Sequence, residues 1–308
     1  MATTVSPEIS NSIGLASQYL PLLDEIYKAE SKTALLDTAQ DRVRWSNDTQ
    51  SFYLFETDMG GLGNYSRNGG YVRGDVTASW RQYTPQWDRG RQFLVDNMDN
   101  AESMGLAFGT LAAEFMRTKV IPEVDACRFA AYAKQASNSM KTAENISTGS
   151  GAVAAIDLGT EKLDDAEVPY EGRILFVNPT MYRYLKAGIT RYTMNGENGI
   201  DYNVEMYNDM RVITVPSGRF NTVCTLAEPT GHGDAGGYTA AGSTINFVII
   251  HPSAVMQAVK LTEPRIFSPA VVQQANAWQY DFRQYHGAWV KHQKANGIYV
   301  NAPTVVSA

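Results

Sequence analysis

An acidic cluster, Asp96, Asp99 and Glu102, is the first place where this sequence offers acid–base chemistry. Two carboxylates held in a cleft can act as general acid and general base, so a hydrolase is one interpretation. The same residues also fit a helix start, because Asp99 followed three residues later by Glu102 resembles a capping box with aspartate in first position. Capping explains the cluster without a cleft, and we therefore assign no catalytic residue.

Other reactive motifs lack the residues that their chemistry needs. The glycine-rich residues 60–63 are not followed by the lysine and hydroxyl residue of a phosphate-binding loop. Ser150 lacks the flanking pattern of a nucleophile elbow, and His232 near Asp234 has no second histidine at ligand spacing. His251 precedes a proline at a strand-to-helix corner, where we expect it to act as a cap. We expect no cofactor-binding and no metal-binding residue.

Composition narrows the class of protein. The 308 residues are 44% hydrophobic, which allows one or two domains, and the net charge of -6 argues against a chain whose whole surface binds nucleic acid. No apolar run reaches about 18 residues and no signal peptide is evident, so we expect neither a membrane span nor secretion. The two cysteines, Cys127 and Cys224, are expected to be reduced and buried.

The N-terminal third is interpreted as an arm followed by a ribbon. Residues 1–42 have too little apolar content for a core of their own and should lie on another surface. Residues 43–98 contain a strand at 52–55, a glycine-rich tip and a return run from Val72 to Trp87, with Phe93 and Val95 beyond it. An isolated two-stranded ribbon is marginal in water, so its aromatic side chains should find a partner surface on another copy of the chain.

The ribbon is rich in arginine and contains no lysine, since the sequence has none between Lys32 and Lys119. Arginine binds carboxylates in a bidentate manner and stacks on aromatic rings, which suits an intersubunit contact; a solvated basic ribbon is the alternative. The candidates for an assembly interface are aromatic and charged side chains of the ribbon and of the helix after it: Trp80, Arg81, Tyr83, Trp87, Arg89, Arg91, Glu114 and Arg117. Glu114 and Arg117 lie three apart on that helix and can pair.

A long spine helix is expected within residues 99–140. Its apolar stripe consists of Met104, Phe108, Leu111 and Phe115. Pro122 should interrupt this helix and open a second one, because proline suits the first turn of a helix and not its interior. Glu123 and Asp125 would then favour the positive N-terminal end of the second helix.

The rest of the chain has the pattern of a mixed α/β body. Strands are expected at 173–177, 211–215, 245–250 and 278–282. Residues 145–152 and 217–244 are rich in small and polar residues and are interpreted as loops. Residues 178–180 should end the first of these strands and open a short helix, and a second short helix should start at residue 254.

The order of these residues resembles that of major capsid proteins of tailed bacteriophages with the Hong Kong 97-like fold. The first group that carries the resemblance is Asp88, Arg89, Phe93, Asp96, Asp99, Asn100, Glu114, Arg117, residues 120–125 and Arg128. The second group is residues 247–255, Lys260 and residues 297–300. The resemblance implies an α+β fold with an N-terminal arm (1–42), an extended E-loop (43–98), a spine helix and entry to the axial domain (99–140), the axial domain (141–265), and return strands of the peripheral domain with the C-terminus (266–308).

The resemblance also implies a function without catalysis. Copies would form hexamers and pentamers of an icosahedral head that encloses double-stranded DNA without sequence-specific binding, in a virion assembled in the host cytoplasm. Portal and decoration proteins would be partners, and scaffolding would come from a separate protein or be absent, because no long segment precedes the ribbon. The lysine-free ribbon predicts no isopeptide crosslinks. An encapsulin-type compartment and a surface or tail-associated binding protein are the alternatives.

Overall fold

The computed structural model describes residues 31–37, 51–97, 112–189, 204–229, 235–272 and 275–304. Its strands are β1 (Phe52–Met59), β2 (Val76–Tyr83), β3 (Trp87–Asp96), β4 (Lys141–Ala143), β5 (Ile174–Val177), β6 (Met206–Tyr207), β7 (Met210–Thr214), β8 (Asn221–Leu226), β9 (Tyr238–Thr244), β10 (Phe247–Ile250), β11 (Val255–Phe267), β12 (Ala277–Val290) and β13 (Ile298–Ala302). The helical segments are η1 (Ala34–Leu36), η3 (Met116–Val120), α4 (Ile121–Gln135), η4 (Asn138–Met140), α5 (Gly149–Asp165), α6 (Pro179–Gly188), η5 (Ser217–Arg219), η6 (Pro252–Ala254) and η7 (His292–Gly297). This combination of helices and strands confirms the expected α+β class.

The body is built on a six-stranded sheet with the order β4–β13–β10–β5–β7–β6. Its central strands β5 and β10 are continuous apolar runs in which every residue is buried, as strands covered on both faces must be. Helices α5 and α6 pack against one face, and α4 packs against the other. The strands expected at 173–177, 211–215 and 245–250 are therefore confirmed as β5, β7 and β10.

Aromatic and small residues set how closely these layers approach. Phe129 of α4 meets Phe176 of β5 and Phe220 edge to face, with ring centroids 5.3 and 4.9 Å away. On the opposite face, Gly159 of α5 lies directly over Tyr299, where an added Cβ would stand 2.7 Å from a ring carbon. A larger residue at this position would push the helix off the sheet.

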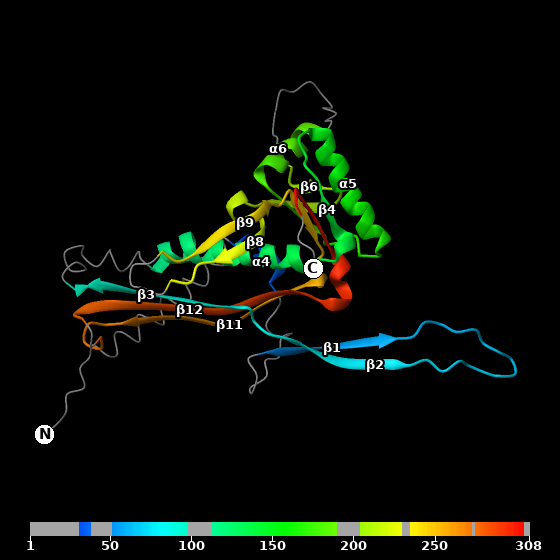
Figure 1. Cartoon of the computed structure of the whole chain (residues 1–308), viewed down its shortest axis with the longest axis horizontal. Coiled ribbons are helices and arrows are strands. Elements are labelled where there is room, and N and C mark those ends of the chain that lie inside the picture. The colour runs from blue at the N-terminus through cyan, green and yellow to red at the C-terminus, as the bar shows by residue number, and fades with distance from the viewer. Residues whose placement is uncertain are drawn as a thin grey trace.

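A long antiparallel sheet with the order β11–β12–β3 lies beside the body (Figure 1). Strand β12 has 14 residues and pairs with β11 on one edge and β3 on the other. Along β3 the side chains alternate between half-buried and exposed, so one face of this sheet is turned toward the spine helix. The strand expected at 278–282 is confirmed as the centre of β12.

The ribbon is shorter than the sequence predicts. Strands β1 and β2 pair from Phe52 opposite Tyr83 to Met59 opposite Val76, and the loop between them forms a far tip. Figure 1 shows this hairpin projecting beyond every other element. The return run does not continue along the ribbon, because β3 belongs to the sheet with β12. Residues 43–50 lie outside the described part of the chain.

Pro122 lies in the first turn of α4, as expected, but the helical rod continues through this point and does not end before it. Residues 112–115 are helical, η3 is a π-type turn, and α4 follows directly, with Pro122 in its first turn. A π-type turn alters the hydrogen-bond spacing just before a residue that has no N–H to donate. Phe115 packs in the core between helix and sheet, whereas Met104, Phe108 and Leu111 of the expected stripe lie outside the described residues.

Three further expectations are corrected. The loop expected at 145–152 ends at Gly149, where α5 begins after the cap Thr148. Residues 217–244 are not a loop throughout, because β8 and β9 form a hairpin within them that packs on α4. The helix expected from 254 to 259 is wrong, because Ala254 ends η6 and residues 255–259 are the start of β11. The short helix at Pro179 is confirmed as α6, with Asn178 as its cap. No described helix is long and apolar enough to span a membrane.

Candidate assembly surfaces

The distal half of the β1–β2 hairpin presents apolar side chains to solvent. Phe55 and Trp80 stand opposite each other in the strand register, with ring centroids 5.0 Å apart, and they are 50% and 66% exposed. Tyr65 and Tyr71 form a second ring pair at 4.9 Å near the tip. Further large apolar side chains are exposed along the same hairpin: Tyr53, Met59, Leu62, Val72 and Val76. Large apolar side chains exposed together on one hairpin are candidates for contact with a partner.

The base of the same hairpin is held by its own chain. Tyr83 is 6% exposed, stacks on Phe52 and meets Trp289 of β12 edge to face. The Tyr83 hydroxyl donates a hydrogen bond to a Glu56 carboxylate oxygen at 3.2 Å, and Arg81 pairs with the other oxygen at 3.0 Å. Three residues of this hairpin were candidates for an assembly interface. Trp80 is accessible to a partner, and Arg81 is paired with Glu56 but 45% exposed. Tyr83 instead anchors the hairpin to its own chain.

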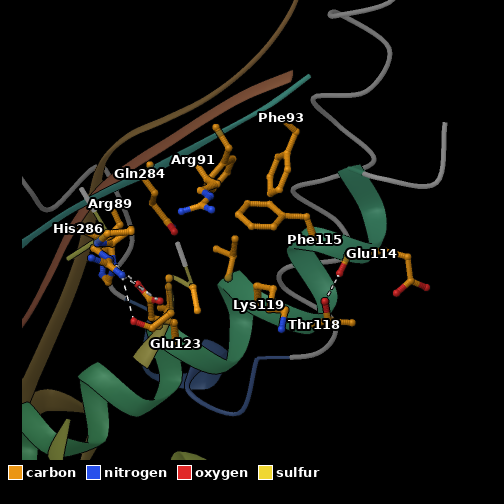
Figure 2. A pocket seen from close by; sticks show the side chains of 18 residues that line it. Arg89, Arg91, Phe93, Glu114, Phe115, Thr118, Lys119, Glu123, Gln284 and His286 are labelled. Atoms are coloured by element: carbon orange, nitrogen blue, oxygen red, sulfur yellow. Dashed lines mark hydrogen bonds and ion pairs between the residues drawn. The ribbon is translucent and has the colours of Figure 1, made fainter. Parts of the chain in front are cut away.

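A cavity of about 460 Å³ lies between β3, the spine helix and the loop that leads into β9. Three aromatic side chains line part of this cavity. Phe93 and Phe115 meet edge to face with ring centroids 4.9 Å apart, and Phe282 lies next to Phe115. Figure 2 shows Arg91 pointing from its strand into the space between strand and helix. Three of the sequence candidates, Arg89, Arg91 and Glu114, line this cavity.

Arg89 ties three elements together at one end of the cavity. Its guanidinium bonds Glu123 of α4 at 2.7 Å, and it also donates to the carbonyls of Ala227 and Gly237 at 2.8 and 3.2 Å. The side chains of Arg89 and Glu123 are 24% and 14% exposed. Arg89 thus joins β3 to α4 and to the loop end of the β8–β9 hairpin, and Glu123 serves this contact rather than only the helix end.

Trp87 and His286 lie against each other where β3 meets β12. Their ring centroids are 5.2 Å apart, and Trp87 is half-buried against the body's core. Burial lowers the pKa of His286 to about 3, with the positive charges of Arg128 and Arg89 adding to the effect. The imidazole is therefore neutral at physiological pH. Both residues have structural roles in this chain.

Glu114 and Arg117 form the expected surface pair. The distance from Arg117 Nη2 to Glu114 Oε1 is 2.8 Å, and the two side chains are 58% and 53% exposed. Exposed pairs of this kind contribute little to stability, which leaves both groups available for other contacts. Asp96 ends β3 on the side facing away from the helix, while Asp99 and Glu102 lie outside the described residues. No group of side chains in the described ranges could hold a metal ion.

The sequence pattern misses a buried ionic cluster on α4. Asp125 and Arg128 are both 0% exposed. Asp125 accepts hydrogen bonds from the hydroxyls of Ser31 and Thr33 at 2.7 and 2.8 Å and from the backbone N–H of Lys32 at 3.0 Å. Arg128 donates to the Thr33 hydroxyl at 2.8 Å and pairs with Asp37 at 3.1 Å.

This cluster fixes the described part of the arm, residues 31–37, against the spine helix. The assignment of Asp125 to the helix end is therefore wrong, because its carboxylate faces another segment of the chain. A weak signal was present, since Ile121 and Phe129 lie four residues before and after Asp125 and would share its helix face. The partner segment could not be identified in this way.

His251 takes the capping role that the sequence predicts. Its Nδ1 accepts a hydrogen bond from the backbone N–H of Ser253 at 3.3 Å, and its Nε2 lies 3.2 Å from the carbonyl of Glu171. This arrangement requires the neutral tautomer with the proton on Nε2, and burial lowers the pKa of His251. The imidazole therefore closes the corner between β10 and β11.

Comparison with known proteins adds evidence about the fold. No protein-family model and no curated protein sequence matches the chain. Among solved structures, a chain from Mycobacterium phage Che8 is 15% identical, with 90% of this chain and 93% of that chain covered and a TM-score of 0.60. A chain from the capsid structure of cyanophage P-SCSP1u is 13% identical over 88% of this chain and 87% of that chain, with a TM-score of 0.60.

A third similar chain comes from the asymmetric unit of the mature capsid of bacteriophage PhiM1. It is 13% identical, with 83% of this chain and 82% of that chain covered and a TM-score of 0.56. The likeness extends over most of both chains in each case, at low identity. It shows that this chain has a fold found in phage capsid structures.

Proposed function

We propose that this chain, whose fold occurs in phage capsids, is the major capsid protein of a tailed phage and not an enzyme. The observation that carries the proposal is the projecting β1–β2 hairpin, on which Phe55, Met59 and Trp80 are 50%, 68% and 66% exposed. A two-stranded hairpin with such side chains is marginal alone in water. A neighbouring copy of the chain would supply the surface that covers them.

The two ends of the hairpin suit this role differently. At the base, Phe52 and Tyr83 anchor the strands to Trp289, so the hairpin leaves the body in a defined direction. Beyond the base, the exposed Phe55 and Trp80 offer apolar area and an aromatic pair to a partner. Because the base of the hairpin is packed on the body and its outer half is exposed, one subunit can contact the next at a fixed angle. A closed shell requires such a fixed angle.

Under this proposal the chain works as a container wall. Copies assemble into hexamers and pentamers of an icosahedral head around double-stranded DNA, in the host cytoplasm, and a scaffolding protein, a portal and decoration proteins are the expected partners. The net charge of -6 fits a wall that holds DNA without binding it tightly or by sequence.

The proposal is tested by expressing the chain and examining it by sedimentation and negative-stain electron microscopy. The wild type should form closed shells, tubes or capsomer rings. Trp80→Glu should remain as small species with an unchanged melting temperature, because the ring is largely solvent-exposed in the single chain. The matched control is Leu158→Glu on α5, where a 38% exposed apolar residue is replaced away from the hairpin. Assembly of Trp80→Glu to the same extent as the wild type would refute the role of the hairpin.

The contents of particles purified from the natural source distinguish a phage head from a compartment of the encapsulin type. Double-stranded DNA protected from nuclease is expected for a phage head. A protein cargo without DNA would instead assign the chain to a compartment of the encapsulin type.

A further inference from the structure

Two cysteines from distant parts of the chain meet beside the spine helix. Cys127 lies on α4 and Cys224 on β8, 97 positions later, and their sulfur atoms are 3.6 Å apart. Both are free thiols. The sequence predicts two reduced, buried cysteines but gives no reason to place them together. The contact is independent of the proposed shell function.

The local structure presents the two thiols differently. Cys127 is 2% exposed within the core around α4, whereas Cys224 is half-buried. Alternation along β8 leaves Val223 and Thr225 exposed and turns Cys224 toward the helix. A reagent from solution can therefore reach Cys224 first, and Cys127 lies behind it.

The β8–β9 hairpin is a separate two-stranded sheet, joined to neither larger sheet by strand pairing in the described residues. Its contacts with α4 and the bonds from Arg89 to Ala227 and Gly237 hold it in place. A covalent link at Cys224 would fix the middle of β8 to the helix. The link would close a loop of nearly one hundred residues, for which the loss of chain entropy in the unfolded state is large.

We propose that Cys127 and Cys224 are a modification site that forms an intramolecular disulfide on exposure to a small-molecule disulfide such as oxidised glutathione. The Cys224 thiolate attacks one sulfur of the reagent, its S–S bond breaks, and one thiol leaves after taking a proton from water. Cys127 then loses its proton to water and attacks the Cys224 sulfur, which releases the second thiol. Two protein thiols are oxidised and one reagent disulfide is reduced to two thiols.

The electrostatics of the pair agree with this order of attack. The hydrogen bond between the two thiols, together with burial, raises the pKa of Cys127. The same bond, with Cys127 as donor, lowers the pKa of Cys224. Glu123 and Arg89 are the charged neighbours of both groups and act in opposite directions. The more accessible sulfur is thus also the one that ionises more readily.

The test is to incubate the native full chain with oxidised glutathione, block remaining thiols under denaturing conditions, and measure intact mass and non-reduced peptides. The wild type should lose two hydrogens and yield one peptide pair joined through Cys127 and Cys224. Cys127→Ala should accumulate glutathione on Cys224, because no second thiol can displace it. Cys224→Ala should stay unmodified, since Cys127 is buried.

A thermal measurement gives a second readout. The oxidised wild type should melt higher than the reduced form, by on the order of 5–10 °C, and the difference should vanish with a reductant and in Cys127→Ala. A wild type that keeps both thiols free, or that retains glutathione on Cys224 without closing the bridge, would overturn the proposal. A bridge between Cys127 and Cys224 without an increase in melting temperature would support the modification site but contradict the expected stabilisation.

Discussion

Replacing Asp125 with alanine should release residues 31–37 from the spine helix and lower the free energy of unfolding. The carboxylate is 0% exposed and accepts hydrogen bonds from Ser31, Lys32 and Thr33, with Arg219 at 3.5 Å as a further partner. The substitution leaves buried donors without an acceptor.

The magnitude follows from the number and kind of these bonds. Hydrogen bonds to a charged group contribute about 1.5–3 kcal/mol each, and they are not additive within one cluster. Removing one member of a buried charged pair costs about 3–5 kcal/mol. We therefore expect Asp125→Ala to lose about 3–5 kcal/mol at neutral pH. Asp125→Asn should also be destabilising, because its amide must place a donor against the N–H of Lys32 or the hydroxyl of Ser31.

Denaturant unfolding measures the global effect, and hydrogen exchange measures the local one. The amide of Lys32 donates to Asp125 at 3.0 Å and should exchange much faster in the variant. The matched control is Glu114→Ala on the same helical rod, whose side chain is 58% exposed and whose loss should change stability by less than about 1 kcal/mol. The reasoning is refuted if Asp125→Ala unfolds within about 1 kcal/mol of the wild type and the Lys32 amide stays protected.

Two further predictions concern pH and covalent chemistry. Because the pKa of His286 is depressed to about 3 in the folded chain, its contribution is fully present above the unfolded pKa of about 6.5 and is lost as pH falls toward 3. Stability of the wild type should therefore fall by about 1.4 kcal/mol more per pH unit than that of His286→Gln below pH 6, measured by denaturant midpoints; equal slopes would argue against a buried neutral imidazole. Mature particles should run as monomers on a denaturing gel, since the hairpin contains no lysine between Lys32 and Lys119 to form isopeptide bonds; covalent ladders would contradict this.

Local sequence patterns predicted the elements whose burial is set by their own residues. The apolar runs of β5 and β10 are followed by Asn178-Pro179 and His251-Pro252. The sequence therefore predicted both the strands and the points at which they end. The alternation of Trp278, Tyr280 and Phe282 likewise predicted β12. In these cases local propensity and tertiary environment favour the same structure.

The misses arise where distant partners decide the structure. Residues 255–259 have a helix-compatible pattern, but pairing with β12 over the whole of β11 makes them a strand. Pro122 predicted a break that the π-type turn η3 accommodates within a continuous rod. The β8–β9 hairpin was missed because its small and polar residues resemble a loop, and its packing partner is a distant helix, α4, which β8 contacts.

The surroundings of the candidate interface residues could be predicted only in part for the same reason, and their role in assembly stays a prediction. Trp80 is open to a partner, as expected for an assembly contact, whereas Tyr83 and Trp87 are used within the chain. Asp125 and Cys224 were placed on elements whose neighbours cannot be known from spacing alone. Their contacts join segments 92 to 97 residues apart in sequence.

Oxidative footprinting of Trp80 in assembled and dissociated protein tests the central claim most directly. The account predicts strong protection of Trp80 in the sedimenting particle and rapid oxidation in the free subunit, where the side chain is 66% exposed. Trp289, 5% exposed at the base of the hairpin, should react slowly in both and serves as the internal reference. Equal oxidation of Trp80 in both states would contradict burial of the hairpin against a neighbouring copy.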